Sequence, residues 1–116
     1  MREKYLSNLK LVVVKVGTST LSSKSHPMDR GAVKKISKQI CELLDKGIKV
    51  VLVSSGAIGA GMHLLGLKAR PKTLSHLQAA AAIGQAQLMK AYDEYFKAQG
   101  RKVAQVLLTR DDLEEH

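Results

Sequence analysis

Two short runs of small and polar residues are the parts of this 116-residue sequence best suited to chemistry. The first is Lys15-Val16-Gly17-Thr18-Ser19 and the second is Ser54-Ser55-Gly56. Glycines and small side chains let backbone amides approach a phosphate or a carboxylate without steric obstruction. The second run also precedes an expected helix, whose first amides favour an anion. A third polar run, Thr109-Arg110-Asp111, lies near the end of the sequence.

Lys15 and Ser55 are the most specific candidates within these runs. Lys15 ends an apolar run that is typical of a buried strand, where an unpaired ammonium is costly, so a role as a cation aimed at ligand phosphates is favoured. The alternative is an edge strand on which Lys15 faces solvent. Ser55 is equally well explained as the N-cap of the following helix, and a cap is compatible with a ligand contact.

The charge distribution favours an anionic ligand. There are 19 Lys and Arg against 10 Asp and Glu, a formal net charge of +9, and no acidic residue lies between Asp45 and Asp93. A middle without carboxylates does not repel an anion, although a solvated basic surface has the same composition. Nucleic acid is another possible partner of such a charge. With no Trp, one Phe and three Tyr, however, a platform for stacking bases is not expected.

Several classes of site are missing from the sequence. It contains neither the P-loop pattern nor the dinucleotide fingerprint, and it has no nucleophile elbow. The four histidines are scattered and Cys41 is the only cysteine, so neither a metal site nor an internal disulfide is expected. Cys41 itself is expected to be inert. No apolar run approaches the roughly 20 residues of a membrane span, and the sequence predicts a cytoplasmic protein without a membrane partner.

The elements that position these runs are expected in the order strand, helix, strand. Residues 9–16 are predicted to be a central parallel strand covered on both faces. Residues 17–26 are predicted to be a polar loop. Asp29 is expected to cap a helix that ends before Gly47, and a second strand is expected over residues 49–53. This order makes a right-handed βαβ unit.

The second half of the sequence predicts a long helix followed by a third strand. The helix is expected to begin at a capping box formed by Ser75 and Gln78, to run to about Ala98 and to stop at Gly100. Gly84 inside it indicates a close helix contact or a bend. Its expected buried stripe is Leu77, Ala81, Leu88, Tyr92 and Tyr95.

Residues 102–108 are predicted to form the third strand. The fold class is therefore α/β with at least three parallel strands, within one domain over residues 1–116. Ligands bind such sheets at the carboxyl ends of the strands, where the three polar runs are expected to converge.

Four segments resemble the amino-acid kinase family. Residues 12–19 (VVVKVGTS) are similar to its opening strand and glycine loop. Residues 51–61 (VLVSSGAIGAG), 78–85 (QAAAAIGQ) and 105–113 (QVLLTRDDL) are similar, in the same order, to the branch that phosphorylates glutamate. One such block would be a weak signal, whereas four in order are specific. The resemblance covers the chain from about Leu9 onward.

The resemblance implies a fold and an activity. The fold would be a three-layer αβα sandwich with a mainly parallel sheet, incomplete in this chain. The reaction would be ATP-dependent phosphorylation of the γ-carboxylate of L-glutamate to glutamyl 5-phosphate, with Mg²⁺, as the first step of proline synthesis. The residues that the resemblance assigns to the ATP phosphates are Lys15, which would be catalytic, Gly17, Thr18 and Ser19. Those that it assigns to glutamate are Ser55, Gly56 and Ala57.

Kinase domains of this family are far longer than 116 residues. The chain is therefore expected to be an N-terminal, substrate-side portion that is inactive alone, and the full-length enzyme is expected to be a homo-oligomer. One alternative is another amino-acid kinase, such as an acetylglutamate or aspartate kinase, against which residues 54–58 (SSGAI) argue. A non-catalytic module that binds anions or nucleic acid is the other.

Overall fold

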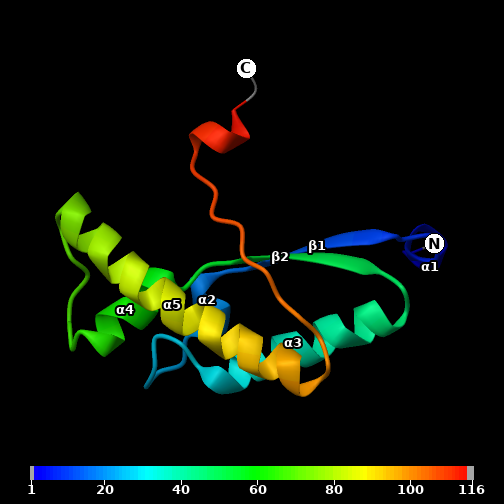
Figure 1. The fold of residues 1–116 in the computed structure, drawn as a ribbon, viewed down its shortest axis with the longest axis horizontal. Helices are drawn as coiled ribbons and strands as arrows, with labels where there is room; N and C mark the ends of the chain where they lie inside the picture. Colours follow the sequence, from blue (N-terminus) through cyan, green and yellow to red (C-terminus); the bar gives the residue numbers. More distant parts are fainter. Residues whose placement is uncertain (1, 115–116) are drawn as a thin grey trace.

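The computed structural model describes residues 2–114 and shows a mixed α/β arrangement (Figure 1). Two parallel strands, β1 and β2, pair in register from Leu11 with Lys49 to Val16 with Ser54. The elements in chain order are α1 (Arg2–Leu6), β1 (Leu11–Val16), α2 (Thr18–Leu21), α3 (Arg30–Asp45), β2 (Lys49–Ser54), α4 (Ala57–Leu64), α5 (Leu74–Ala98) and the 3-10 helix η1 (Asp111–Leu113).

The βαβ unit β1-α3-β2 is confirmed, with both of its expected helix ends. Asp29 is the N-cap of α3, and its side chain accepts a hydrogen bond from the Gly31 amide at 2.8 Å. At the other end Gly47 has a φ of +79°, and its amide donates to the Leu44 carbonyl at 2.9 Å. A left-handed glycine that closes a helix in this way lets β2 begin two residues later.

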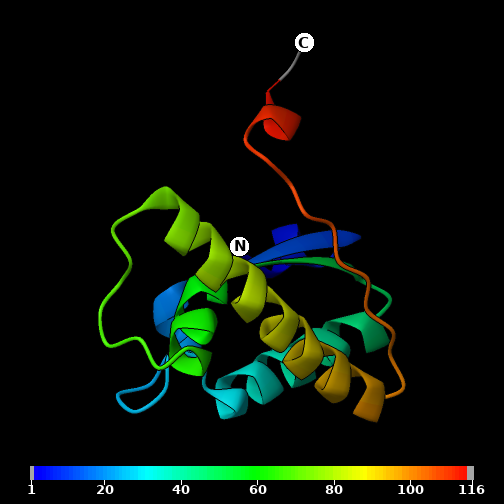
Figure 2. The same cartoon turned by 60° about the vertical axis from the view of Figure 1, so that its left-hand side comes forward.

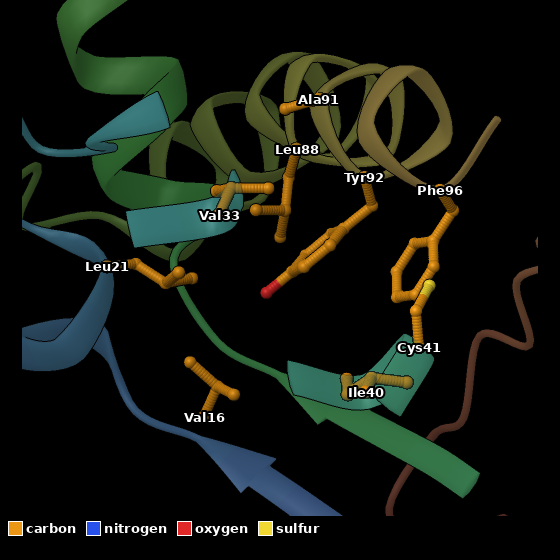
Figure 3. Close-up of a cluster of buried hydrophobic side chains, with 9 residues drawn as sticks. All are labelled: Val16, Leu21, Val33, Ile40, Cys41, Leu88, Ala91, Tyr92 and Phe96. Carbon is orange, nitrogen blue, oxygen red and sulfur yellow. The ribbon is translucent and has the colours of Figure 1, made fainter. Parts of the chain in front are cut away.

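Helices α3 and α5 cover one face of the sheet (Figure 2). Every second residue of each strand points toward these helices, as the twofold alternation of a strand requires. Cys41 lies in this core, where burial raises the pKa of its thiol, in agreement with the expected inert cysteine. The buried apolar cluster, drawn in Figure 3, is Val16, Leu21, Val33, Ile40, Cys41, Leu88, Ala91, Tyr92 and Phe96.

The other face of the sheet is open, so the prediction that β1 is covered on both faces is wrong for the described residues. Leu11 and Val13 of β1 are 55% and 62% exposed, and Val51 and Val53 of β2 are 49% and 47% exposed. Parallel sheets normally carry helices on both faces. The residues described here supply helices for one face only, which gives two layers.

The predicted third strand is also wrong. Residues 101–109 form no regular secondary structure, and they lead away from the body of the molecule in both ribbon views (Figures 1 and 2). Val103 still packs against the core, and Gln85 donates to the Gln105 side chain at 2.9 Å. Beyond that point Val106 is 79% exposed. A run of β-forming residues becomes a strand only where a neighbouring strand accepts its hydrogen bonds.

Two local expectations about α5 need correction. The helix begins one residue before Ser75, and its N-cap is Thr73 rather than a capping box from Ser75 to Gln78. Of the expected stripe only Leu88 and Tyr92 are buried, whereas Leu77, Ala81 and Tyr95 are half-buried. The reason is that α4 packs on the first half of α5, so the small residues of α5 that face α4, Ala80 and Gly84, are buried there. The buried residues of α5 are Ala80, Gly84, Leu88, Ala91, Tyr92 and Phe96.

The close helix contact expected at Gly84 is confirmed. A Cβ placed on Gly84 would overlap the Ala57 carbonyl of α4, and one placed on Gly61 of α4 would overlap the Ala80 carbonyl. The two helices therefore touch backbone to backbone. Within residues 2–114, none of the helices combines the length and the apolar character needed to cross a membrane.

Candidate functional site

The first two polar runs meet at the carboxyl edge of the sheet, as predicted. The strand pairing ends at Val16 and Ser54, and the Ser55 amide then donates to the Val16 carbonyl at 2.9 Å. This bond holds the chain leaving β2 against the chain leaving β1. The segments that follow β1 and β2, which begin with Gly17 and Ser55, are therefore adjacent at one edge of the sheet, and both strands end on the same side in Figure 1.

The Gly17 loop is open to a ligand. Gly17 has a φ of −83°, and apart from Gly17 and its two neighbours in the chain, no atom of residues 2–114 lies within 4 Å of the position that a Cβ would take there. The side chains of Thr18 and Ser19 are exposed beside it. The prediction of a loop over residues 17–26 is wrong for Thr18–Leu21, which form the helix α2. This helical turn directs Leu21 into the core, where its side chain is fully buried.

Lys15 lies on the open face of the sheet, opposite Val53 in the register. Its side chain is exposed, in agreement with a lysine on an edge strand rather than on a strand buried on both faces. It also stands two residues before Gly17, at the same edge as both loops. An ammonium in this position is free to reach an anion held over the edge.

The Gly56 turn directs helix amides toward the same edge. Gly56 is the N-cap of α4 with a φ of +109°, a conformation that L side chains rarely adopt, and Leu21 packs beneath it. No side chain caps α4, so the expectation that Ser55 is its N-cap is wrong. The first amides of α4 therefore lack a side-chain partner, and such amides favour a negative charge. Ala57, which begins α4, is half-buried, and the Ser55 side chain is exposed.

Ser54 and Tyr92 are two further residues at this turn that sequence reasoning did not single out. Ser54 Oγ lies 2.9 Å from the Tyr92 hydroxyl and 3.0 Å from the Ser55 carbonyl oxygen. Tyr92 comes from α5, and its burial raises the pKa of the phenol more than the bond to Ser54 lowers it. The inward alternation of Val50, Leu52 and Ser54 would have placed Ser54 on the core side, but its partner could not have been found that way.

The third polar run is not brought to this edge. Thr109, Arg110 and Asp111 lie in the exposed C-terminal segment, away from the two loops (Figure 2). There the Asp112 carboxylate accepts from the Thr109 amide at 2.7 Å and from its hydroxyl at 2.9 Å, which lowers the pKa of Asp112. The run depended on a third strand to carry it to the sheet edge, and the described structure contains only two strands.

The site is thus an edge suited to anions, built from one ammonium and two glycine turns. It contains no nucleophile paired with a base. Among residues 2–114 there is also no group of three His, Cys, Asp or Glu side chains that could hold a metal ion. The arrangement fits a reaction that needs its substrates positioned and their charge neutralised.

Comparison with known proteins agrees with this class of site. The chain belongs to the amino acid kinase family, whose model matches residues 10–116. Among curated proteins, the glutamate 5-kinase of Clostridium acetobutylicum is 53% identical over 112 residues, covering 97% of this chain and 42% of the relative. The glutamate 5-kinase of Geobacter sp. strain M21 is 50% identical over 113 residues, covering 97% of this chain and 30% of the relative. That of Moorella thermoacetica is 49% identical over 108 residues, covering 93% of this chain and 29% of the relative. The chain therefore spans less than half the length of these three relatives.

Proposed function

We propose that this chain is the substrate-side part of a glutamate 5-kinase, an enzyme that transfers the γ-phosphoryl group of ATP to the γ-carboxylate of L-glutamate. The observation that carries the proposal is identity of about half to glutamate 5-kinases along 97% of the chain. The anion-suited edge formed by the Gly17 loop and the Gly56 turn supports it. For the complete polypeptide we further propose the three-layer αβα fold, in which additional helices cover Leu11, Val13, Val51 and Val53.

The proposed roles follow from the position of each residue at the edge. Lys15, with the Gly17 loop and its neighbours Thr18 and Ser19, would hold the ATP phosphates. Ser55, Gly56 and Ala57 would hold glutamate, because the first amides of α4 have no side-chain cap and can donate to a carboxylate.

In the reaction, a γ-carboxylate oxygen attacks the γ-phosphorus and the bond from phosphorus to the ADP oxygen breaks, giving glutamyl 5-phosphate and ADP. No proton has to move and no side chain forms a covalent intermediate. The protein contributes position and positive charge.

Two expectations from the resemblance remain predictions. Mg²⁺, when bound with ATP, neutralises charge on the transferring phosphoryl group. Residues 2–114 contain no group of three His, Cys, Asp or Glu side chains that could hold the ion, and the roles that we propose for this chain concern the phosphates and the carboxylate. Assembly into a homo-oligomer stays a prediction for the full-length enzyme.

A chimera tests the proposed function. In it, this chain replaces the matching segment of the Clostridium acetobutylicum relative, to which it is 53% identical. With glutamate, ATP, Mg²⁺ and hydroxylamine, we expect the chimera to form glutamyl hydroxamate, the trapped product of an acyl phosphate. The 116-residue chain alone is expected to form none, because a kinase needs donor, acceptor and metal held together.

Parallel assays with N-acetylglutamate and with aspartate as acceptors test the family alternatives. A chimera that keeps the melting temperature of the parent, yet phosphorylates one of these acceptors in preference to glutamate, would contradict the proposal. Kinase-like turnover by the isolated chain, on the order of 1 per second, would contradict the proposal that this chain supplies only part of the active site.

Ser55→Ala tests the placement of the two ligands. In the chimera we expect the KM for glutamate to rise about three- to tenfold, as for the loss of one hydrogen bond to a charged group, while the KM for ATP stays nearly constant. The reason is that Ser55 lies on the Gly56 turn and the phosphates are proposed to lie on the Gly17 loop. Initial rates at varied glutamate and at varied ATP give both constants. An increase in the KM for ATP alone would mean that the ligands occupy the opposite loops.

A further inference from the structure

Tyr92 brings a hydroxyl group from α5 to Ser54, the last residue of β2. Its side chain extends from α5 toward the strands, between Leu88 and Phe96 (Figure 3), and the residue is only 3% exposed. A buried phenol needs a hydrogen-bond partner, and the partner here is Ser54 Oγ at 2.9 Å, 38 positions earlier in the chain. The contact joins the end of β2 to the C-terminal half of α5.

The direction of these hydrogen bonds connects Tyr92 to the Gly56 turn. Ser54 Oγ donates to the Ser55 carbonyl oxygen at 3.0 Å, which uses its one hydrogen. The Tyr92 hydroxyl must then donate to Ser54 Oγ. The result is a relay of two hydrogen bonds that begins in the core and ends on the peptide between Ser55 and Gly56.

That peptide decides how the turn presents its groups. Its carbonyl belongs to Ser55 and its amide to Gly56, the residue that carries the φ of +109° before α4. Because the peptide is planar, its rotation turns the Ser55 carbonyl and the Gly56 amide together, and Gly56 is one of the residues proposed to hold glutamate. The preceding peptide, between Ser54 and Ser55, is held by the hydrogen bond that the Ser55 amide donates to the Val16 carbonyl. Ser54 Oγ holds the next peptide, between Ser55 and Gly56, through its bond to the Ser55 carbonyl oxygen.

We propose that Tyr92 is a positioning residue for the carboxylate substrate: through Ser54 it orients the peptide between Ser55 and Gly56, and so sets the affinity for glutamate. The inference rests on the proposed function, since it names a residue that serves the same site. Tyr92 does not itself reach the edge, because its hydroxyl is covered by Ser54 and the core.

Tyr92→Phe separates this role from packing. The ring is kept, including its stacked contact with Phe96, whose centroid lies 6.4 Å away, and only the hydroxyl is removed. Tyr95→Phe is the matched control, since Tyr95 is a half-buried tyrosine on the same helix whose ring lies under Arg30, away from the turn. A purely structural Tyr92 would lower the melting temperature without changing substrate affinity.

The first measurement uses the 116-residue chain itself. In ¹H–¹⁵N spectra we expect Tyr92→Phe to shift the Gly56 and Ala57 amide signals and to speed their hydrogen exchange, with Tyr95→Phe leaving both unchanged. Unchanged signals at Gly56 and Ala57 in Tyr92→Phe would overturn the proposal. This measurement needs no catalysis, so its outcome stands even if the chimera fails to phosphorylate glutamate, a failure that would instead count against the proposed function.

The second measurement uses the chimera. Tyr92→Phe is expected to raise the KM for glutamate about three- to tenfold, with little change in the KM for ATP or in the melting temperature. Ser54→Ala should act in the same direction, and the double variant should resemble Ser54→Ala rather than combine the two effects, because both residues act in one relay. Equal increases in the two KM values, or full additivity of the two substitutions, would overturn the proposal.

Discussion

Replacing Lys15 by alanine in the chimera is expected to lower kcat by about 100- to 1000-fold, the usual cost of removing one preorganised group that stabilises transition-state charge. In the 116-residue chain the same substitution should hardly change the melting temperature. Lys15 is exposed there on the open face of the sheet, and substitutions at such positions usually alter stability by less than about 0.5 kcal/mol. Single-turnover and steady-state rates of hydroxamate formation, together with a thermal melt, measure both effects.

Lys49→Ala is the matched control for this experiment. Lys49 is an exposed lysine on the same sheet, and it pairs with Leu11 at the amino end, whereas Lys15 pairs with Val53 near the carboxyl end. Both substitutions remove one positive charge from the surface of a strand. If overall charge attracts ATP, the two variants will lose activity equally. If Lys15 contacts the phosphates, only Lys15→Ala will lose most of its kcat, and Lys15→Arg will recover part of it.

The rule that matters at this site is the direction of the strands. Parallel strands bring their carboxyl ends to one edge, and this was sufficient to predict that the Gly17 loop and the Gly56 turn meet there. The same rule failed for Thr109, Arg110 and Asp111, because it was applied to a strand that the structure does not contain. The rule predicts which loops converge only among strands that are present.

Local chemistry predicted the helix ends well. Asp29 accepts from the amide of Gly31, and Gly47 and Gly100 adopt φ values of +79° and +75° just after α3 and α5. Each of these features depends on residues within one turn of the chain. The N-cap of α5 is an instructive failure, because Thr73 and Ser75 are both good caps and their order in the sequence does not say which one the helix uses.

Features that depend on distant neighbours could not be predicted in this way. Whether β1 is covered on one face or on both depends on which helices pack on it. The apolar sequence of β1 is compatible with both arrangements, so it does not distinguish them. Leu21 stands in a polar run, yet it fills the core beneath Gly56. The hydrogen bond between Ser54 and Tyr92 joins two elements 38 positions apart, and no local pattern indicates it.

The contact between α4 and α5 leads to the second large prediction. Gly84 of α5 faces Ala57 and Gly61 of α4 so closely that an added Cβ would lie 2.5 Å from the Gly61 amide nitrogen and would overlap the Ala57 carbonyl. These are backbone atoms, which cannot move aside as a flexible side chain can. Ala57 begins α4 at the end of the candidate site where we propose that glutamate binds. The packing of α4 against α5 therefore also fixes the position of this end of the site.

Gly84→Ala is therefore expected to destabilise the chain by about 3 kcal/mol, the upper part of the usual range for overpacking. For a domain of this size that corresponds to a fall in the melting temperature of more than about 10 °C. Helix propensity alone predicts the opposite sign, because alanine in the interior of a helix is favoured over glycine by about 1 kcal/mol. Thermal and denaturant unfolding of the 116-residue chain can thus distinguish the two effects by direction as well as by size.

Gly17→Ala is the control. Apart from its neighbours in the chain, no atom of the described residues lies within 4 Å of the Cβ it would add, and its φ of −83° suits any residue. It should leave the melting temperature nearly unchanged or raise it slightly. A rise in stability for Gly84→Ala would show that α4 can move away from α5 at little cost, and the Gly56 turn would then not be held by this contact. With the expected fall, the same variant in the chimera should also lose affinity for glutamate, because a displaced α4 carries its first amides and Ala57 away from the edge that Lys15 and the Gly17 loop share.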